Sequence, residues 1–201
     1  MASEIDICNL ALAHLGDTAT IASISPPEGS AQAEHCARFY PVARDTLLES
    51  HNWKFATRRA TLALLDADAF NWTYAYAEPA GALRVVSILP GTAMSTDEGE
   101  QFETMGDDEG NALVLTDLED ATALYTVRVT DTTKFSPLFV DALSRLLAAY
   151  LAGPVIKGDL GKAEAKAQMQ HFRLASNLAI TSDANQRKVT PEHSVGWIAG
   201  R

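Results

Sequence analysis

The chain has several residues whose side chains could do chemistry, and the first to test is the glycine-bounded segment Gly153–Gly158. A phosphate-binding loop of this spacing needs a lysine directly after its second glycine, because the ammonium group must reach the phosphates. Asp159 stands at that position, and no strand of the expected kind precedes the segment. We therefore interpret Gly153–Gly158 as a turn between two helices.

Histidines and cysteines are the next candidates, as metal ligands or as a nucleophile with its base. No two histidines lie at ligand spacing with an acidic partner, and no cysteine pair accompanies them. His35 and Cys36 are neighbours, but adjacent helical residues point about 100° apart and do not form a working pair. Cys8 and Cys36 occupy apolar helical positions, which favours buried free thiols over a disulfide. No metal and no cofactor are expected. The histidines are His14, His35, His51, His171 and His193.

Loop acids are the remaining candidates for catalysis. The segment Asp107–Gly110 lacks the alternating ligands and the closing glutamate of a calcium loop, so we expect the solvated tip of a hairpin. No serine nucleophile elbow occurs in the sequence. A metal-dependent hydrolase would have to be built from the loop acids Asp97, Asp107, Asp108 and Asp117. The sequence favours a protein that is not an enzyme.

Composition and charge limit the class of protein further. The chain has 201 residues, with 47% hydrophobic and 21% charged residues, which is typical of a globular domain. Its 26 acids and 16 bases give a net charge of −10 without a basic run, which disfavours tight DNA binding. An acidic surface could still let DNA pass without adhering. There is no signal-peptide pattern, and no apolar segment approaches the eighteen residues that span a bilayer, so we expect a soluble protein.

Hydrophobic periodicity predicts four helices, at about residues 3–15, 30–50, 136–152 and 160–182. Ser3 and Asp6 fit a capping box that begins the first helix, and Gly16 ends it. Pro137 suits the first turn of the third helix, and Gly153–Pro154 is expected to end that helix. The apolar residues that we expect to face inward on the fourth helix are Ala163, Ala167, Phe172, Ala175, Leu178 and Ala179.

The second helix is expected to carry one apolar stripe, with charged residues on its other faces. The stripe is Cys36, Phe39, Tyr40, Ala43, Leu47 and Leu48, and the charged residues are Arg38, Arg44, Asp45 and Glu49. The inward seam of the third helix is Leu138, Phe139, Ala142, Leu143, Leu146, Leu147, Tyr150 and Leu151.

Between the second and third helices, at about residues 53–130, the period changes to that of strands. Trp53–Ala56 alternates as the entrance to a strand would. Acidic, glycine-bearing pieces separate the later strands, as hairpin loops do. The six expected strands are Thr57–Leu65, Trp72–Tyr76, Leu83–Leu89, Gln101–Met105, Ala112–Thr116 and Ala123–Val129. The predicted fold class is α+β: mainly a helical bundle of about four helices, with an inserted small antiparallel β-sheet region.

The last fifteen residues, 187–201, show neither the helical nor the strand period of apolar residues. We therefore divide the chain into a domain at 1–186 and an extended C-terminal tail at 187–201. Trp197 lies four residues from the end and needs burial. It either folds back on its own domain or belongs to a segment that docks on another subunit. The candidate docking residues are Val189, Val195, Trp197, Ile198 and Arg201.

Five sequence phrases, in the same order, resemble the tail tubular protein A family of tailed bacteriophages, which are head-to-tail adaptors also found in prophages. The resemblance covers about residues 5–180. The phrases are Cys8–Gly16, Cys36–Trp53, Tyr74–Pro79, Leu83–Val85 and Phe135–Leu143.

This resemblance implies a homo-oligomeric ring, typically a dodecamer, beneath the portal protein at the phage neck. The ring would present a surface to the distal tail or nozzle protein, DNA would pass through it without specific binding, and the C-terminal segment would contact the portal. It also implies a virion protein that is made in the cytoplasm of the host bacterium, with no catalytic residues to carry over. Two alternatives remain: a tail-associated metal-dependent hydrolase, and a receptor-binding accessory protein that uses the β region.

Overall fold

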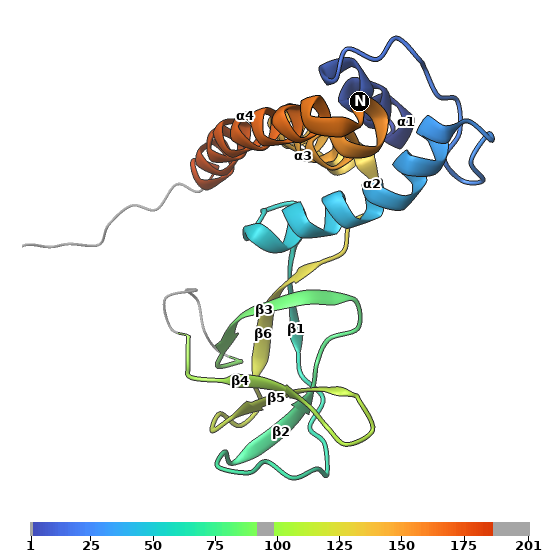
Figure 1. Cartoon of the computed structure of the whole chain (residues 1–201). Helices are drawn as coiled ribbons and strands as arrows, with labels where there is room; N and C mark the ends of the chain where they lie inside the picture. The colour runs from blue at the N-terminus through green and yellow to red at the C-terminus, as the bar shows by residue number, and fades with distance from the viewer. Residues whose placement is uncertain (1, 92–98, 187–201) are drawn as a thin grey trace, which may run out of the picture.

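The computed structural model describes residues 2–91 and 99–186, and in these ranges the protein is α+β, as predicted (Figure 1). Helices lie at one end of the molecule and two small antiparallel sheets at the other (Figure 1). The helices of the described ranges are α1 (Glu4–His14), α2 (Ala31–Ser50), α3 (Pro137–Ile156) and α4 (Gly158–Ala184), with a 3-10 turn at Thr132–Lys134.

Serine caps begin the first three helices. The Ser3 hydroxyl accepts the Asp6 amide at 3.1 Å and the Asp6 carboxylate accepts the Ser3 amide at 2.8 Å, so the predicted capping box is confirmed. Ser30 and Ser136 cap α2 and α3 in the same way. Gly16 follows α1 with φ +74°, the left-handed conformation that a glycine adopts at low cost.

The main hydrophobic core lies around α3, which packs against each of the other three helices. Cys36, Tyr40 and Leu47 of α2 are buried there, as their spacing predicts. Most of the predicted α3 seam is buried as well, but Tyr150 is only half-buried and Leu138 is 38% exposed. Cys8 and Cys36 are both buried free thiols. The hydrogen bond that the Cys8 thiol donates to Cys36, together with burial, raises the pKa of Cys8.

By length and composition alone, α3 could cross a membrane, so the expectation that no apolar segment approaches eighteen residues is wrong. Asp141 and Arg145 nevertheless interrupt its first half with an ion pair of 3.2 Å. More than half of the apolar stretch is buried against other helices of the same chain. Contact with three other helices therefore accounts for its apolar composition.

The predicted end of α3 at Gly153–Pro154 is also wrong, because the helix continues to Ile156. A proline disfavours helical backbone in the residue before it through a clash with that residue's Cβ, and Gly153 has none. The Lys157 amide still donates to the Gly153 carbonyl at 3.0 Å. The turn expected over Gly153–Gly158 is therefore confined to Lys157 and Gly158, both at positive φ.

The inward face of α4 is only partly the predicted one. Ala175 and Ala179 are buried and Ala167 and Phe172 are half-buried, but Ala163 is exposed and Leu178 is 63% exposed. Polar groups take inward positions instead, and some of them find partners there: the Gln168 Nε2 group donates to the His14 carbonyl at 3.2 Å and to the Glu164 carboxylate at 2.8 Å. The buried face of α4 comprises Gly161, Gln168, Ala175, Ser176, Ala179 and Asp183.

The predicted small sheet is in fact two three-stranded antiparallel sheets. The first has the order β1–β6–β3, with Thr57 opposite Thr126, and the second has the order β2–β5–β4. Residues of both sheets, such as Tyr76, Val85 and Val114, share one core between them. The strands are β1 (Thr57–Thr61), β2 (Tyr74–Ala77), β3 (Ala82–Leu89), β4 (Glu103–Gly106), β5 (Ala112–Thr116) and β6 (Thr122–Val127).

Trp53–Ala56 is not the strand entrance that its alternation predicts. The segment turns, with the Ala56 amide donating to the Trp53 carbonyl at 3.0 Å. The Trp53 indole is buried and donates to the Leu47 carbonyl at 2.8 Å. β1 is also shorter than predicted and ends at Thr61.

Two chain segments, 51–56 and 128–136, connect the helices with the sheets, and aromatic side chains pack where these segments meet. The rings of Trp53 and Phe139 meet edge to face at 5.0 Å between centroids, and those of Phe55 and Phe135 lie 5.6 Å apart. Beside them, Asp45 forms ion pairs with Arg44 at 2.9 Å and Arg128 at 2.8 Å.

Arg44 is consequently buried, which corrects its predicted place on an outward face of α2. The sheets cover this part of α2: α2 contacts β3 and β6, and Asp45 joins Arg44 to Arg128 just after β6. The Arg44 guanidinium also lies 6.0 Å from the centre of the Tyr40 ring.

Candidate functional site

The predicted docking residues Val189, Val195, Trp197, Ile198 and Arg201 lie outside the described residues. What the structure places is the helix from which that segment continues. α4 ends at Ala184, two residues before the end of the described chain.

The last turn of α4 is attached to the end of α2 through Asp183. Asp183 is 5% exposed, and its carboxylate accepts the Lys54 amide at 3.1 and 3.3 Å. The His51 ring nitrogen Nε2 lies 3.4 Å from the same carboxylate, and the His51 ring meets Trp53 edge to face. Sequence reasoning missed this attachment, because Asp183 falls one residue beyond the predicted end of the helix.

An uncovered apolar face is the second feature of α4. Leu160, Leu174 and Leu178 are 78%, 66% and 63% exposed, which are the three largest exposures of large apolar side chains in the described ranges. Their separations of fourteen and four residues are close to whole helical turns, so they share one side of the helix. The inward face of α4 is already packed on α3, so this second face has no partner within the described chain.

A groove between α3 and α4 borders this leucine face. It has a volume of about 310 Å³ and is lined by Asp141, Arg145, His171, Leu174, Ala175 and Leu178. The Asp141–Arg145 ion pair forms the α3 wall. Burial, and next the nearby Arg145 charge, lower the pKa of His14 at the end of α1, whose Nε2 lies 3.1 Å from the Ser144 hydroxyl. The groove therefore combines an apolar wall with a charged one.

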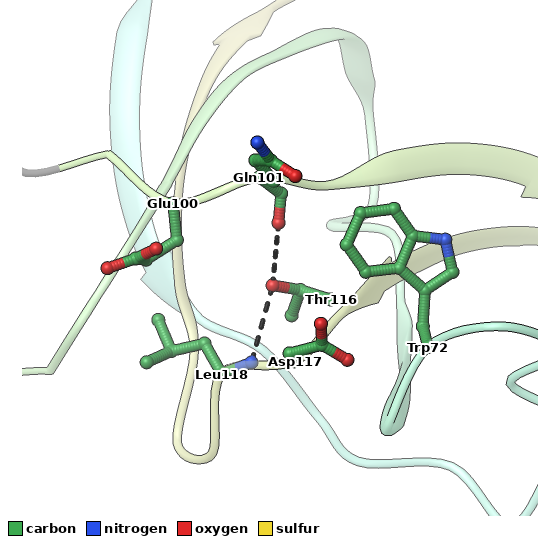
Figure 2. Close-up of a pocket in the computed structure, with 6 residues that line it drawn as sticks. All are labelled: Trp72, Glu100, Gln101, Thr116, Asp117 and Leu118. Carbon is green, nitrogen blue, oxygen red and sulfur yellow. Dashed lines mark hydrogen bonds between the residues drawn. The ribbon is translucent and has the colours of Figure 1, made fainter.

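A second pocket, of about 340 Å³, lies in the sheet region (Figure 2). Its lining residues are Trp72, Glu100, Gln101, Thr116, Asp117 and Leu118. Figure 2 shows the Thr116 hydroxyl at its centre, donating to the Gln101 carbonyl at 2.9 Å, while Trp72 and Glu100 lie on opposite sides. An aromatic ring beside carboxylates and an amide could bind a polar ligand with an apolar face.

Two of the four acids proposed for a metal-dependent hydrolase have structural roles. Asp107 accepts the amides of Glu109 and Asn111 at the predicted hairpin tip, which Gly110 turns at φ +85°. Hydrogen bonds from the side chain and amide of Asn111 hold the Asp107 pKa below its usual value. Asp117 accepts both the amide and the hydroxyl of Thr73. Asp97 lies outside the described residues, and within them no three His, Cys, Asp or Glu side chains are grouped to hold a metal.

Charge is distributed unevenly between the two ends of the molecule. The described residues from Thr57 to Val127 carry eleven acids and three bases, a net charge of −8. The other described residues carry twelve acids and ten bases, a net charge of −2. The sheets thus hold most of the negative charge, and the helices that carry the exposed leucines are nearly neutral.

Comparison with known proteins adds no relative: no protein-family model matches the chain, and no curated protein matches it.

Proposed function

We propose that the protein is a structural head-to-tail adaptor of a tailed bacteriophage or prophage, in which copies form a ring between the portal and the tail. One observation carries the proposal: a nearly neutral helical end with an uncovered leucine face is joined to a strongly acidic sheet end. The resemblance of five sequence phrases to tail tubular protein A supports the same function.

Such a division of charge suits a ring that encloses DNA. Neighbouring copies can pack through nearly neutral helices, because little charge repulsion opposes their contact. Acidic sheets directed at the channel would repel the phosphates of passing DNA, since both carry negative charge. The screening length at physiological salt is about 8 Å, so this repulsion acts close to the channel wall.

The finer parts of the proposal concern the bundle, the tail and the partners. We propose that the four helices act as one bundle, that twelve copies complete the ring, and that the distal tail or nozzle protein contacts its far side. The segment 187–201 would extend to the portal and dock there through Val189, Val195, Trp197, Ile198 and Arg201. The attachment of Asp183 to the Lys54 amide would give that segment a fixed starting point.

The test is assembly of the full-length chain with its cognate portal protein, followed by electron microscopy and mass measurement. We expect rings stacked on the portal. Monomers of the chain alone are compatible with the proposal, because ring closure can wait for the portal. A chain that stays monomeric in the presence of the portal would refute the adaptor function.

A receptor-binding accessory protein is the second candidate, and the pocket beside Trp72 favours it (Figure 2). Binding of the purified full-length chain to host cells, abolished by Trp72→Ala, would support this candidate over the adaptor. Leu64→Ala is a control, because Leu64 is an exposed apolar residue of the sheet region that does not line this pocket.

A further inference from the structure

We propose that the pocket beside Trp72 binds an organic cation, namely an ammonium or guanidinium group on an alkyl chain such as a lysine or arginine side chain carries. The indole ring and the Asp117 carboxylate would hold the charged group between them. This inference names the ligand class of the pocket that the receptor-binding candidate would use. Its test needs only the purified chain, so its outcome is separate from that of either proposed function.

The surroundings of the pocket carry much negative charge and almost no positive charge. Between Arg59 and Arg128 the sequence has thirteen acids and a single base, Arg84. Arg84 lies on β3, outside the sheet that carries Thr116, and donates to Asn52. None of the residues that line the pocket is a base. The electrostatic potential in the pocket therefore favours a cation.

Asp117 supplies a hydrogen-bond acceptor next to the indole ring. Its Oδ1 atom accepts the amide and the hydroxyl of Thr73 at 2.9 and 2.8 Å, and Thr73 directly follows Trp72 in the chain. These bonds hold the carboxylate in place and leave Oδ2 without a partner among the described residues. Glu100, on the side of the pocket opposite Trp72, forms no ion pair with a described residue (Figure 2). Both carboxylates can therefore accept from the N–H groups of a cation.

Trp72 supplies an aromatic face that is already fixed. Its Nε1 group donates to the Glu103 carboxylate at 3.1 Å, and its amide donates to the Ala69 carbonyl at 2.8 Å. The indole N–H is thus occupied, and what the ring offers to a ligand is its face. The face of a tryptophan attracts cations more strongly than that of the other aromatic residues. The alkyl chain that carries the charge can pack on the same surface.

The other walls of the pocket are held by hydrogen bonds within the protein. The buried Thr116 hydroxyl donates to the Gln101 carbonyl at 2.9 Å, and the Tyr76 hydroxyl donates to the Leu118 carbonyl at 2.9 Å (Figure 2). The volume of about 340 Å³ is at the small end for ligand pockets, which suits one side chain better than a large ligand.

A neutral saccharide is the less favourable ligand for this pocket. It could stack on Trp72 and donate a hydroxyl group to Asp117. Hydrogen bonds between a cation and a carboxylate are stronger than those between a neutral donor and the same carboxylate. A cation also gains the attraction of the surrounding acids, which a saccharide does not.

The experiment is an NMR titration of the isotope-labelled full-length chain with Nα-acetyl-arginine amide and with Nα-acetyl-lysine amide. The indole N–H signal of Trp72 is followed, and it is assigned as the signal that Trp72→Phe lacks. Nα-acetyl-citrulline amide is the control ligand, because its side chain resembles that of arginine but has no charge. We expect a saturable shift with both charged ligands and none with citrulline. Higher salt should weaken the binding, because it screens the charges.

Two variants separate the pocket from the general charge of the sheets. Asp117→Asn keeps an acceptor for Thr73 but removes the charge, so it should weaken binding of the arginine derivative about threefold. Asp108→Asn removes the same charge from an exposed side chain that does not line this pocket, and it should leave the affinity unchanged. Equal weakening in the two variants would show diffuse attraction to the acidic sheets and would refute the site.

Spermidine, a free polyamine, distinguishes two sources of the cation. Tighter binding of spermidine than of both amino-acid derivatives would assign the pocket to a free polyamine, and the reverse order would assign it to a side chain of a partner protein. Either order supports a cation site.

Three results would overturn the inference. A shift with citrulline as large as that with arginine would show that charge is not recognised. A saturable shift with methyl glycosides alone would show a saccharide site. No shift with any ligand would show that the pocket binds none of them. None of these results bears on ring formation with the portal, and a chain that forms no ring could still bind the cation.

Discussion

The hydroxyl group of Tyr40 is buried in the helical core and has no hydrogen-bond partner among the described residues. Burial also raises its pKa, because the charged phenolate would lose its water. An unpaired buried hydroxyl contributes nothing to stability, so we expect Tyr40→Phe to leave the free energy of unfolding unchanged or to raise it by up to about 1 kcal/mol. Urea denaturation followed by circular dichroism measures the change.

Trp53→Phe is the matched comparison for Tyr40→Phe, because it removes a buried polar group that does have a partner. It deletes the hydrogen bond to the Leu47 carbonyl and should lower the free energy of unfolding by about 1–3 kcal/mol. A loss of similar size for Tyr40→Phe would contradict the first prediction.

Asp183 provides a second prediction for single residues. Asp183→Ala leaves the Lys54 amide without its acceptor and should lower the free energy of unfolding by about 1–3 kcal/mol. Asp183→Asn keeps an acceptor for that amide and loses only the charge next to His51, so we expect a smaller loss. Hydrogen exchange at the Lys54 amide should be faster in the alanine variant than in the asparagine variant. Equal exchange in both would show that the attachment does not hold the two helices together.

The sequence predicts all four helices within a few residues, because serine caps and three-and-four spacing are local signals. Which side of a helix faces inward is not local. Gln168 and Asp183 of α4 are buried because distant residues, His14 and Lys54, supply their partners. The prediction that Ala163 and Leu178 of α4 face inward therefore fails, because both side chains are exposed.

The close contact between α3 and α4 depends on Gly161. A Cβ atom at this position would lie 2.9 Å from the Ala152 carbonyl oxygen, which is too short for an ordinary contact. Gly161→Val should therefore lower the free energy of unfolding by about 1–3 kcal/mol through overpacking. Ala163→Val, on the exposed side of the same helix, should cost only about 0.5 kcal/mol through helix propensity. Thermal unfolding of the two variants measures both losses in the free energy of unfolding. Equal losses would show that α3 and α4 can move apart to make room for the valine.

At the scale of the whole molecule, the tail provides a further prediction. Deletion of residues 187–201 should leave folding intact and abolish assembly with the portal, because the sequence of these residues has neither the helical nor the strand period that would place it in the domain. Trp197→Ala in the full-length chain is the milder variant and should weaken assembly in the same direction. A large drop in the melting temperature of the truncated monomer would show that Trp197 belongs to the core of its own domain.

The concentration of acids at the sheet end can be counted along the sequence, because both sheets come from one continuous stretch, Thr57–Val127. Which side chains of α4 stay exposed could not be predicted in this way, because it depends on how the helix packs on α3. The predicted docking residues of the tail stay a prediction, since they lie outside the described residues. The sequence thus predicts the α+β class and most elements, and the structure adds the faces on which assembly would depend.

The sheets leave and rejoin the helices through β1 and β6, which are hydrogen-bonded neighbours, with Thr57 opposite Thr126. The chain segment between those two strands therefore begins and ends at neighbouring positions. The segment between β1 and β6 could be lengthened, shortened or replaced during evolution without moving a helix. A foreign hairpin could be grafted between the same two strands. Among related proteins, we expect the sequences of the helices to change slowly. The segment between β1 and β6 should vary more in length and sequence, according to the partner that it contacts.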